Sequence, residues 1–91
     1  MVTAYVSEVI DGDTFKTSKG NIIRLSGVNT SERGTPYNKM AADKLSSLIL
    51  RKTVVYKERA RDNYGRIVAD VYLNSMYINK VMNDYITSII K

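Results

Sequence analysis

The chain has 91 residues, of which 44% are hydrophobic and 25% charged, and this composition indicates one folded domain rather than a disordered segment. It contains no cysteine and no histidine, which excludes a disulfide framework, a thiolate metal site and any chemistry that depends on imidazole. The formal net charge of +5 favours a polyanionic partner, nucleic acid first and an anionic membrane second.

Three short strands joined by tight turns are predicted over the first third of the chain. Residues 2–10 are rich in β-forming side chains, residues 14–17 resume an extended pattern, and residues 22–28 form the third strand. Turn residues separate them at positions 11–13 and 18–21. The pattern is typical of an antiparallel meander.

A helix is predicted to follow a polar loop. Thr35 suits the N-cap and Pro36 the first helical position. Apolar residues at positions 41, 45, 48 and 49 have the spacing of a helix packed on a core. The basic pair at 51–52 suits the C-terminal end of this helix.

Two more strands and a second helix complete the predicted elements. Residues 53–56 begin a strand that extends toward residue 59, and residues 67–73 form the last strand. Val68 and Asp70 are predicted on a solvated face of that strand. After Ser75, an apolar stripe at helical spacing runs from Ile78 to Ile90.

The predicted order βββ-α-ββ-α is the connectivity of a five-stranded OB-fold barrel, an α+β fold that is mainly β. We expect residues 1–91 to form a single domain, although the strand count leaves another small α+β barrel open. The apolar end of the second helix has two interpretations. It folds back on the barrel, or it forms a homodimer interface, because exposed apolar patches tend to be contact sites.

Four polar clusters lie in turns or at strand ends, and together they meet the needs of phosphodiester cleavage. Such a reaction needs cations on the phosphate, a base that takes a proton from the attacking water, and usually a metal ion. Arg24 and Arg66 suit the phosphate, because a guanidinium binds it at two points and stays charged. Glu32 is the candidate base. Without histidine or cysteine, the metal must be a hard ion with oxygen ligands.

The segments IDGDT (10–14), IRLSGVNTSE (23–32) and DNYGR (62–66) resemble the signature segments of the staphylococcal nuclease family, in the same order and with compatible spacing. The resemblance covers nearly the whole chain. It implies an OB-fold, calcium-dependent endonuclease that acts on DNA and RNA, with single strands preferred. It also implies cleavage of the 5′ phosphate–oxygen bond, which leaves a 3′-phosphate.

The resemblance implies a role for each matching residue. Arg24, Glu32 and Arg66 match the catalytic residues, with Glu32 as general base. The predicted calcium ligands are Asp13, Asn29 and, through its backbone carbonyl, Thr30. Tyr64 matches a tyrosine that contacts a nucleotide phosphate, and we predict Asn63 and Arg61 beside it as further substrate-binding residues.

Three departures from the family pattern stand out. Asn29 replaces a second calcium-binding aspartate, which removes one formal charge and predicts weaker calcium binding. Ser31 replaces the usual proline of that loop. The staphylococcal enzyme continues into a third helix with tyrosines beside the nucleotide, whereas this sequence ends at Lys91.

Two other functions remain open at this stage. One is a non-catalytic nucleic-acid-binding OB-fold module, which the loss of an acidic ligand at Asn29 favours. The other is a structural or interaction domain of a larger assembly, for which the open end of the second helix is the support.

The sequence gives little information on localisation. Met1 to Tyr5 lack the basic start and apolar run of a signal peptide, and no apolar run approaches the roughly 20 residues of a membrane span. We expect no membrane partner. The localisation is cytoplasmic if the chain begins as it stands, and secreted if a leader has been removed.

Overall fold

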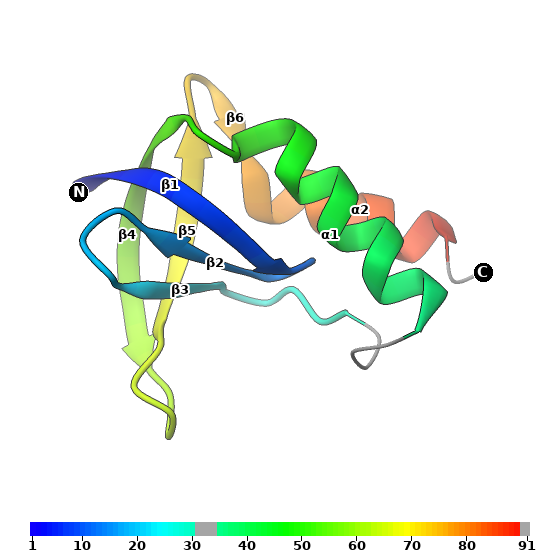
Figure 1. Cartoon of the computed structure of the whole chain (residues 1–91), viewed down its shortest axis with the longest axis horizontal. Helices are drawn as coiled ribbons and strands as arrows, with labels where there is room; N and C mark the ends of the chain where they lie inside the picture. Colours follow the sequence, from blue (N-terminus) through cyan, green and yellow to red (C-terminus); the bar gives the residue numbers. More distant parts are fainter. Residues whose placement is uncertain (31–34, 90–91) are drawn as a thin grey trace.

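Five strands close into a barrel in the computed structural model, which describes residues 1–30 and 35–89 (Figure 1). The strands of the barrel are β1 (Val2–Asp11), β2 (Thr14–Thr17), β3 (Ile22–Leu25), β4 (Thr53–Arg61) and β5 (Ile67–Leu73). The remaining elements are β6 (Met76–Tyr77) and the helices α1 (Pro36–Ile49) and α2 (Ile78–Ile89). The predicted order and the OB-fold are therefore confirmed.

Closure of the barrel depends on one parallel pair of strands. The neighbours run β3-β2-β1-β4-β5 with antiparallel pairing, and β3 then pairs with β5 in parallel. Ile23 lies opposite Ile67 and Leu25 opposite Ala69, and all four side chains are buried. The inward faces of β3 and β5 thus meet in the core, and the alternate residues face outward.

The first helix begins as its capping residues predict. The Thr35 hydroxyl accepts a hydrogen bond from the Asn38 backbone N–H at 3.1 Å, and Pro36 occupies the first turn. The helix ends at Ile49, before the basic pair at 51–52. Arg51 has a positive φ of 62°, and its N–H bonds to the Val6 carbonyl at 2.9 Å. This left-handed residue turns the chain from α1 into β4.

Two strands end at least two residues away from their predicted ends, and one short strand was not predicted. β3 stops at Leu25, because Ser26 bonds to the Ala69 carbonyl and Gly27 turns the chain with a φ of 74°. β4 continues to residue 61, supported by its long pairing with β5. The two-residue strand β6 was not predicted, and it folds back on β5 with Met76 opposite Leu73.

The predicted solvated face of β5 is wrong at Asp70. Asp70 is 6% exposed, and its carboxylate accepts a hydrogen bond from Arg59 Nε at 2.6 Å and another from the Tyr77 hydroxyl at 3.1 Å. The hydrogen bond to Asp70 raises the pKa of Arg59, and burial, together with the same carboxylate, raises the pKa of Tyr77. Asp70 is buried because side chains of two neighbouring strands satisfy it.

The second helix packs its apolar stripe on α1 and β5 (Figure 1). Ile78, Met82 and Ile86 are buried, which supports a helix folded back on the barrel over these residues. Ile90, the end of the predicted stripe, lies outside the described residues. No helix in the described part of the chain is both long and apolar enough to cross a membrane.

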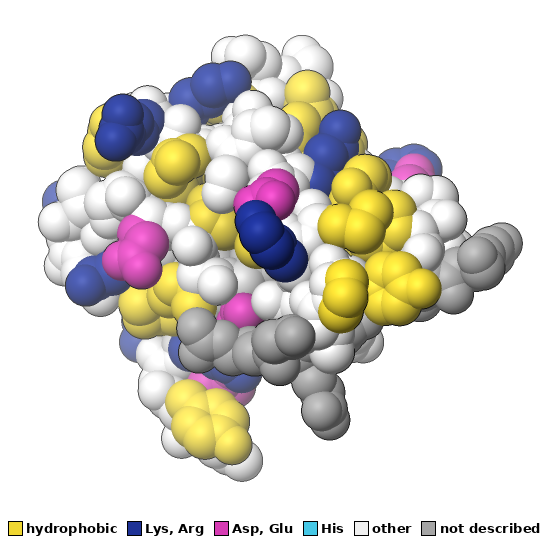
Figure 2. Space-filling view, turned by 45° about the vertical axis from the view of Figure 1, so that its right-hand side comes forward, with side chains coloured by type: hydrophobic (Ala, Val, Ile, Leu, Met, Phe, Trp, Pro, Cys, Tyr) yellow, Lys and Arg dark blue, Asp and Glu magenta, His cyan; other side chains and the backbone are white. Residues whose placement is uncertain are grey.

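Figure 2 shows the molecule turned by 45° from the view of Figure 1, so that the right-hand side of that view comes forward. Hydrophobic side chains gather on one side of this face, and Lys and Arg side chains are spread among Asp and Glu rather than joined in one patch. Tyr37 and Met40 of α1 are 47% and 42% exposed. The charge of +5 therefore does not mark a single binding surface on this face.

Candidate active site

Three predicted site residues meet where β3 ends. Arg24 Nη2 lies 3.5 Å from Asp13 Oδ2 and donates a hydrogen bond to Asn29 Oδ1 at 2.8 Å. It also donates to the Val28 carbonyl at 3.1 Å. The Arg24 side chain is 22% exposed, so these contacts fix its direction while part of the guanidinium still faces solvent.

The β1–β2 turn supplies Asp13 to this cluster. Thr14 lies opposite Arg24 in the β2–β3 pair, and the Leu25 N–H bonds to the Asp13 carbonyl at 2.7 Å. The Thr14 hydroxyl donates to Asp13 Oδ1 at 2.8 Å. Asp13 is only 8% exposed, so its carboxylate lies beside the arginine and is largely shielded from solvent.

A glycine lets this turn approach the first helix. A Cβ atom on Gly12 would lie 2.3 Å from Ala41 Cβ and 2.8 Å from Thr30 Cγ2, closer than such atoms can approach. Asn38 of α1 donates from Nδ2 to Thr30 Oγ1 at 3.5 Å and is 8% exposed. Thr30 therefore lies between α1, which bonds to it through Asn38, and the β1–β2 turn, which packs against it at Gly12.

Asn38 was not predicted as a positioning residue. Its signal was present, since position 38 lies three residues before Ala41 and seven before Leu45, on the buried stripe of α1. A polar side chain on such a stripe needs a hydrogen-bonding partner. Thr30 is one such partner in the structure.

The β4–β5 hairpin carries the second half of the site. Asp62 Oδ1 accepts from the Tyr64 and Arg66 backbone N–H groups at 2.9 and 3.0 Å, and Oδ2 accepts from Arg66 Nε at 2.5 Å. Gly65 takes the left-handed conformation, with a φ of 80°. One carboxylate thus holds both the turn and the arginine, a role for Asp62 that the sequence prediction did not include.

These contacts also shift the acidity of Asp62. Burial alone would raise the pKa of its carboxyl, but the hydrogen bonds from the Arg66 and Tyr64 backbone and from the Arg66 guanidinium together lower that pKa below its ordinary value. The ionised form is the one that the hairpin stabilises.

The three predicted substrate-binding residues lie on or beside this hairpin. Tyr64 is 85% exposed, and its ring centre is 5.4 Å from Arg66 Cζ. Asn63 is exposed in the turn. Arg61 is exposed and donates from Nε to Glu58 Oε2 at 3.2 Å. Their roles stay predictions, because exposure alone does not identify a contact with substrate.

Barrel closure brings Arg24 of β3 near Arg66, at the entrance to β5. Arg24 lies opposite Val68, and Arg66 directly precedes Ile67, which lies opposite Ile23. Their Cα atoms are offset by two residues along the strand direction and by one spacing between strands, which together correspond to roughly 8 Å. Alternation along the strands places both side chains on the outer face. The site thus has two cations side by side, each held by a carboxylate.

The predicted metal ligands have the chemistry that calcium prefers. Asp13 and Asn29 present side-chain oxygens within one cluster, and Thr30 follows Asn29 directly. Calcium takes hard oxygen ligands of this kind. The described residues hold no group of three or more His, Cys, Asp or Glu side chains suited to a metal, and Glu32 lies outside them. The donor set fits calcium in kind but has a single carboxylate.

Comparison with known proteins identifies the family. The family model described as "Staphylococcal nuclease homologue" matches residues 22–85, a span that includes Arg24, Asn29 and Arg66. The chain belongs to the staphylococcal nuclease family. Asp13 lies before the matched span, yet its contact with Arg24 joins it to the same site.

Several similar proteins are named as nucleases. The chain is 38% identical over 60 residues to "Staphylococcal-like nuclease CAN1" of Arabidopsis thaliana, covering 66% of this chain and 19% of that protein. It is 36% identical over 81 residues to an "Uncharacterized endonuclease" of Escherichia coli, covering 85% of this chain and 53% of that protein. A similarly named protein of Haemophilus influenzae is 30% identical over 84 residues, covering 88% of this chain and 47% of its own length. The chain thus spans about half the length of the two bacterial relatives and about a fifth of the plant protein.

In this member of the staphylococcal nuclease family, the departure at Asn29 has a visible consequence. The amide oxygen accepts a hydrogen bond from Arg24, which leaves Asp13 as the sole carboxylate of the cluster among the described residues. The departure at Ser31 lies outside the described residues.

Proposed function

We propose that this domain is a calcium-dependent endonuclease that hydrolyses phosphodiester bonds of DNA and RNA, with single strands preferred. The observation that supports it most is the pair of arginines, Arg24 on β3 and Arg66 directly before β5, the strand that pairs with β3. Both are fixed before any substrate binds, Arg24 by Asp13 and Asn29, and Arg66 by Asp62. Such preorganisation is what stabilises charge that develops in a transition state.

The two guanidinium groups would bind the non-bridging oxygens of one phosphate. A guanidinium has five N–H donors, so Arg24 can keep its contacts with Asn29 and Val28 and still donate to the phosphate. Glu32 is proposed to take the proton of the attacking water. The 5′ oxygen then leaves, and the phosphate remains on the 3′ side.

Calcium would be held by the Asp13 carboxylate, the Asn29 amide oxygen and the Thr30 carbonyl. When bound, the ion supplies positive charge to the phosphate oxygens. Asp13 faces both this position and Arg24, and the Thr14 hydroxyl also bonds to it. We therefore expect calcium binding to be weaker than is usual for the family.

A second function is supported by the same observation at Asn29. With one carboxylate in the cluster, the domain would bind single-stranded nucleic acid through its arginines and the exposed Tyr64 without cleaving it. The nuclease proposal is preferred, because two arginines fixed by separate carboxylates exceed what a binding surface needs.

A calcium titration of cleavage tests the proposal. Purified protein is incubated with single-stranded DNA and with RNA at increasing calcium, against a chelator control. We expect cleavage that needs calcium and falls at least about 100-fold in Glu32→Gln, as is typical for loss of a general base. The matched control is Glu8→Gln, at an exposed position on β1, which should cleave like the parent.

Each result has a defined meaning. Wild-type cleavage that persists in chelator contradicts calcium dependence. A Glu32→Gln variant as active as Glu8→Gln contradicts the assignment of the general base. Binding of DNA without cleavage under calcium, magnesium or manganese selects the non-catalytic binding module.

A further inference from the structure

A separate pocket lies at the far end of the β2–β3 hairpin from Asp13 and Arg24. Its volume is about 370 Å³, within the range of small-ligand sites, and its lining includes Thr3, Ser18, Lys19, Asn21 and Tyr56. None of the residues assigned above to cleavage or metal binding lines it. The pocket is therefore a candidate binding site separate from the cleavage site.

The pocket exists because β1 changes partner along its length. Val2–Tyr5 pairs with β4, whereas pairing with β2 begins at Val6. The Tyr5 carbonyl accepts from the Ser18 N–H at 2.9 Å, so the backbone groups of Tyr5 point away from β4. Alternation along an antiparallel strand directs the N–H and C=O of Thr3 to the same side, where β2 has ended. An open strand edge thus borders the pocket.

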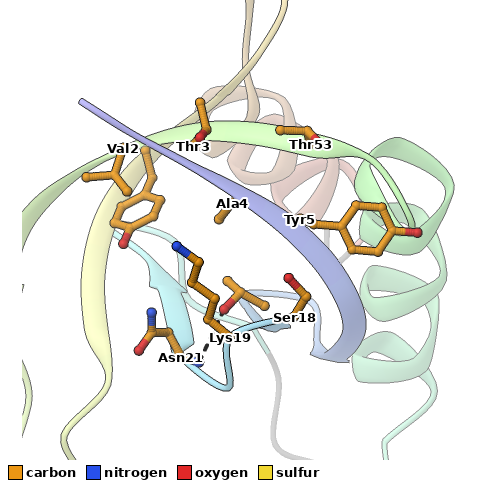
Figure 3. A pocket seen from close by; sticks show the side chains of 10 residues that line it. Val2, Thr3, Ala4, Tyr5, Ser18, Lys19, Asn21 and Thr53 are labelled. Carbon is orange, nitrogen blue, oxygen red and sulfur yellow. Dashed lines mark hydrogen bonds between the residues drawn. The ribbon is translucent and has the colours of Figure 1, made fainter.

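Lys19 is the single charged side chain among the ten lining residues. Figure 3 shows it extending from the turn toward β1, between Ser18 and Asn21, while the Tyr5 side chain points away. The turn that carries Lys19 is held by hydrogen bonds between Thr17 and Asn21, at 2.9 Å and 3.2 Å. An exposed ammonium on a well-held turn therefore lies among neutral hydrogen-bonding groups, with Tyr56 forming part of the pocket lining.

We propose that this pocket binds one nucleotide of a polynucleotide strand, with Lys19 on its phosphate. The neutral donors and acceptors, the Tyr56 wall and the open edge at Thr3 suit a base and sugar, and the ammonium suits the phosphate. The proposal rests on the proposed function, because it takes nucleic acid as the substrate. It adds a second subsite, remote from the cleaved bond.

The position of the pocket predicts a dependence on strand length. Asn21 directly precedes β3, and Arg24 lies three residues further along the chain, which corresponds to about 10 Å at the rise of a β-strand. A polynucleotide strand is long enough to span that distance. A strand that reaches both sites gains affinity, whereas a mononucleotide does not.

Amide NMR in the presence of chelator tests the subsite without cleavage. A single-stranded DNA 12-mer is titrated into the wild type, and a mononucleotide in a parallel series. We expect the 12-mer to shift the amide signals of Thr3 and residues 18–21, together with those of the hairpin at 62–66. The mononucleotide should leave the pocket signals unchanged at the concentrations that saturate the 12-mer.

Charge removal at Lys19 provides the matched comparison. Lys19→Gln should weaken 12-mer binding by about fivefold and reduce the slope of log K against log salt by about 0.7, the value for one phosphate contact on a single strand. The control, Lys80→Gln, removes an equal charge from an exposed lysine paired with Asp84 on α2, and should change neither quantity appreciably. Circular dichroism and thermal unfolding confirm that both variants are folded.

The outcomes separate this inference from the proposed function. A 12-mer that binds and is cleaved, but shifts no pocket amide, overturns the subsite alone, as does equal weakening by the two lysine variants. A mononucleotide that binds the pocket as tightly as the 12-mer overturns the assignment to a strand. Pocket shifts on binding, without cleavage when calcium is added, uphold the subsite and overturn the nuclease proposal.

Discussion

Arg24 contacts both Asp13 and Asn29, two of the three residues expected to hold a metal ion, and this arrangement governs the charge of the site. Asp13 alone contributes a formal negative charge to the described cluster, and Arg24 offsets it at 3.5 Å. Asn29 adds an oxygen but no charge, and that oxygen accepts a hydrogen bond from the arginine at 2.8 Å. A cation entering this position must compete with a guanidinium for its ligands.

A second carboxylate should strengthen metal binding. We predict that Asn29→Asp lowers the calcium concentration for half-maximal binding by about tenfold, because the charge of the ligands sets the affinity. Isothermal titration calorimetry measures this directly. The control is Asn83→Asp, which adds the same charge at an exposed position on α2. Equal calcium affinity in the two variants would show that Asn29 is not a ligand.

At the scale of elements, the β1–β2 turn, the segment at Thr30 and the start of α1 form one packed unit around Gly12. The approach between this turn and Ala41 is closer than any side chain allows. The same helix bonds to Thr30 through Asn38. A shift of α1 would therefore move Thr30.

A methyl group at Gly12 should separate these elements. We predict that Gly12→Ala lowers the free energy of unfolding by about 1–3 kcal/mol, the usual cost of overpacking. Urea denaturation measures the change. Ala41→Gly removes the opposing Cβ, so the cost of Gly12→Ala should be smaller in that background. Independent, additive effects of the two substitutions would contradict direct contact.

The hairpin at 62–66 should lose order in acid. The pKa of Asp62 is lowered in the folded state, so its ionised carboxylate stabilises the turn above the ordinary aspartate pKa of about 3.9. This contribution is lost as the pH falls through the lowered folded-state pKa. We predict that the Tyr64 and Arg66 amide signals shift in that acidic range. Asp62→Asn should show a disordered hairpin already at pH 7, and unchanged amide signals in this variant would disprove the role of Asp62.

At the scale of the whole molecule, local signals predicted the elements better than their contacts. The start of α1 follows from Thr35 and Pro36, and the bounds of β5 were predicted in full, because capping and strand patterns are local. Burial of Asp70 was missed, since its partners come from two other strands. Strand β6 has two residues, too few to show a pattern.

In the candidate site too, some residues could be predicted from local motifs, but their contacts could not. Motifs indicated Arg24 and Arg66, but their proximity depends on pairing between β3 and β5, which no local pattern reveals. Asp62 and Asn38 hold other site residues rather than facing the expected substrate, so resemblance to known catalytic residues did not indicate them.

The homodimer interpretation of the C-terminal helix requires apolar side chains that remain partly exposed in the folded chain. Ile86 is buried, whereas Val81, Tyr85 and Ile89 are half-buried. If these side chains form an interface, light scattering will give twice the mass of 10.3 kDa, and Tyr85→Glu will restore the single mass. A single mass for the unaltered chain over a hundredfold range of concentration would exclude the dimer.

The parallel pair that closes the barrel also bears on how the protein folds. Arg24 and Arg66 are 42 positions apart in the sequence and become neighbours only when β3 meets β5. Contacts between distant segments carry a high entropic cost and form slowly. We therefore expect the arginine pair to assemble late in folding. A partly folded or newly synthesised chain would then contain every residue of the site and still lack its geometry.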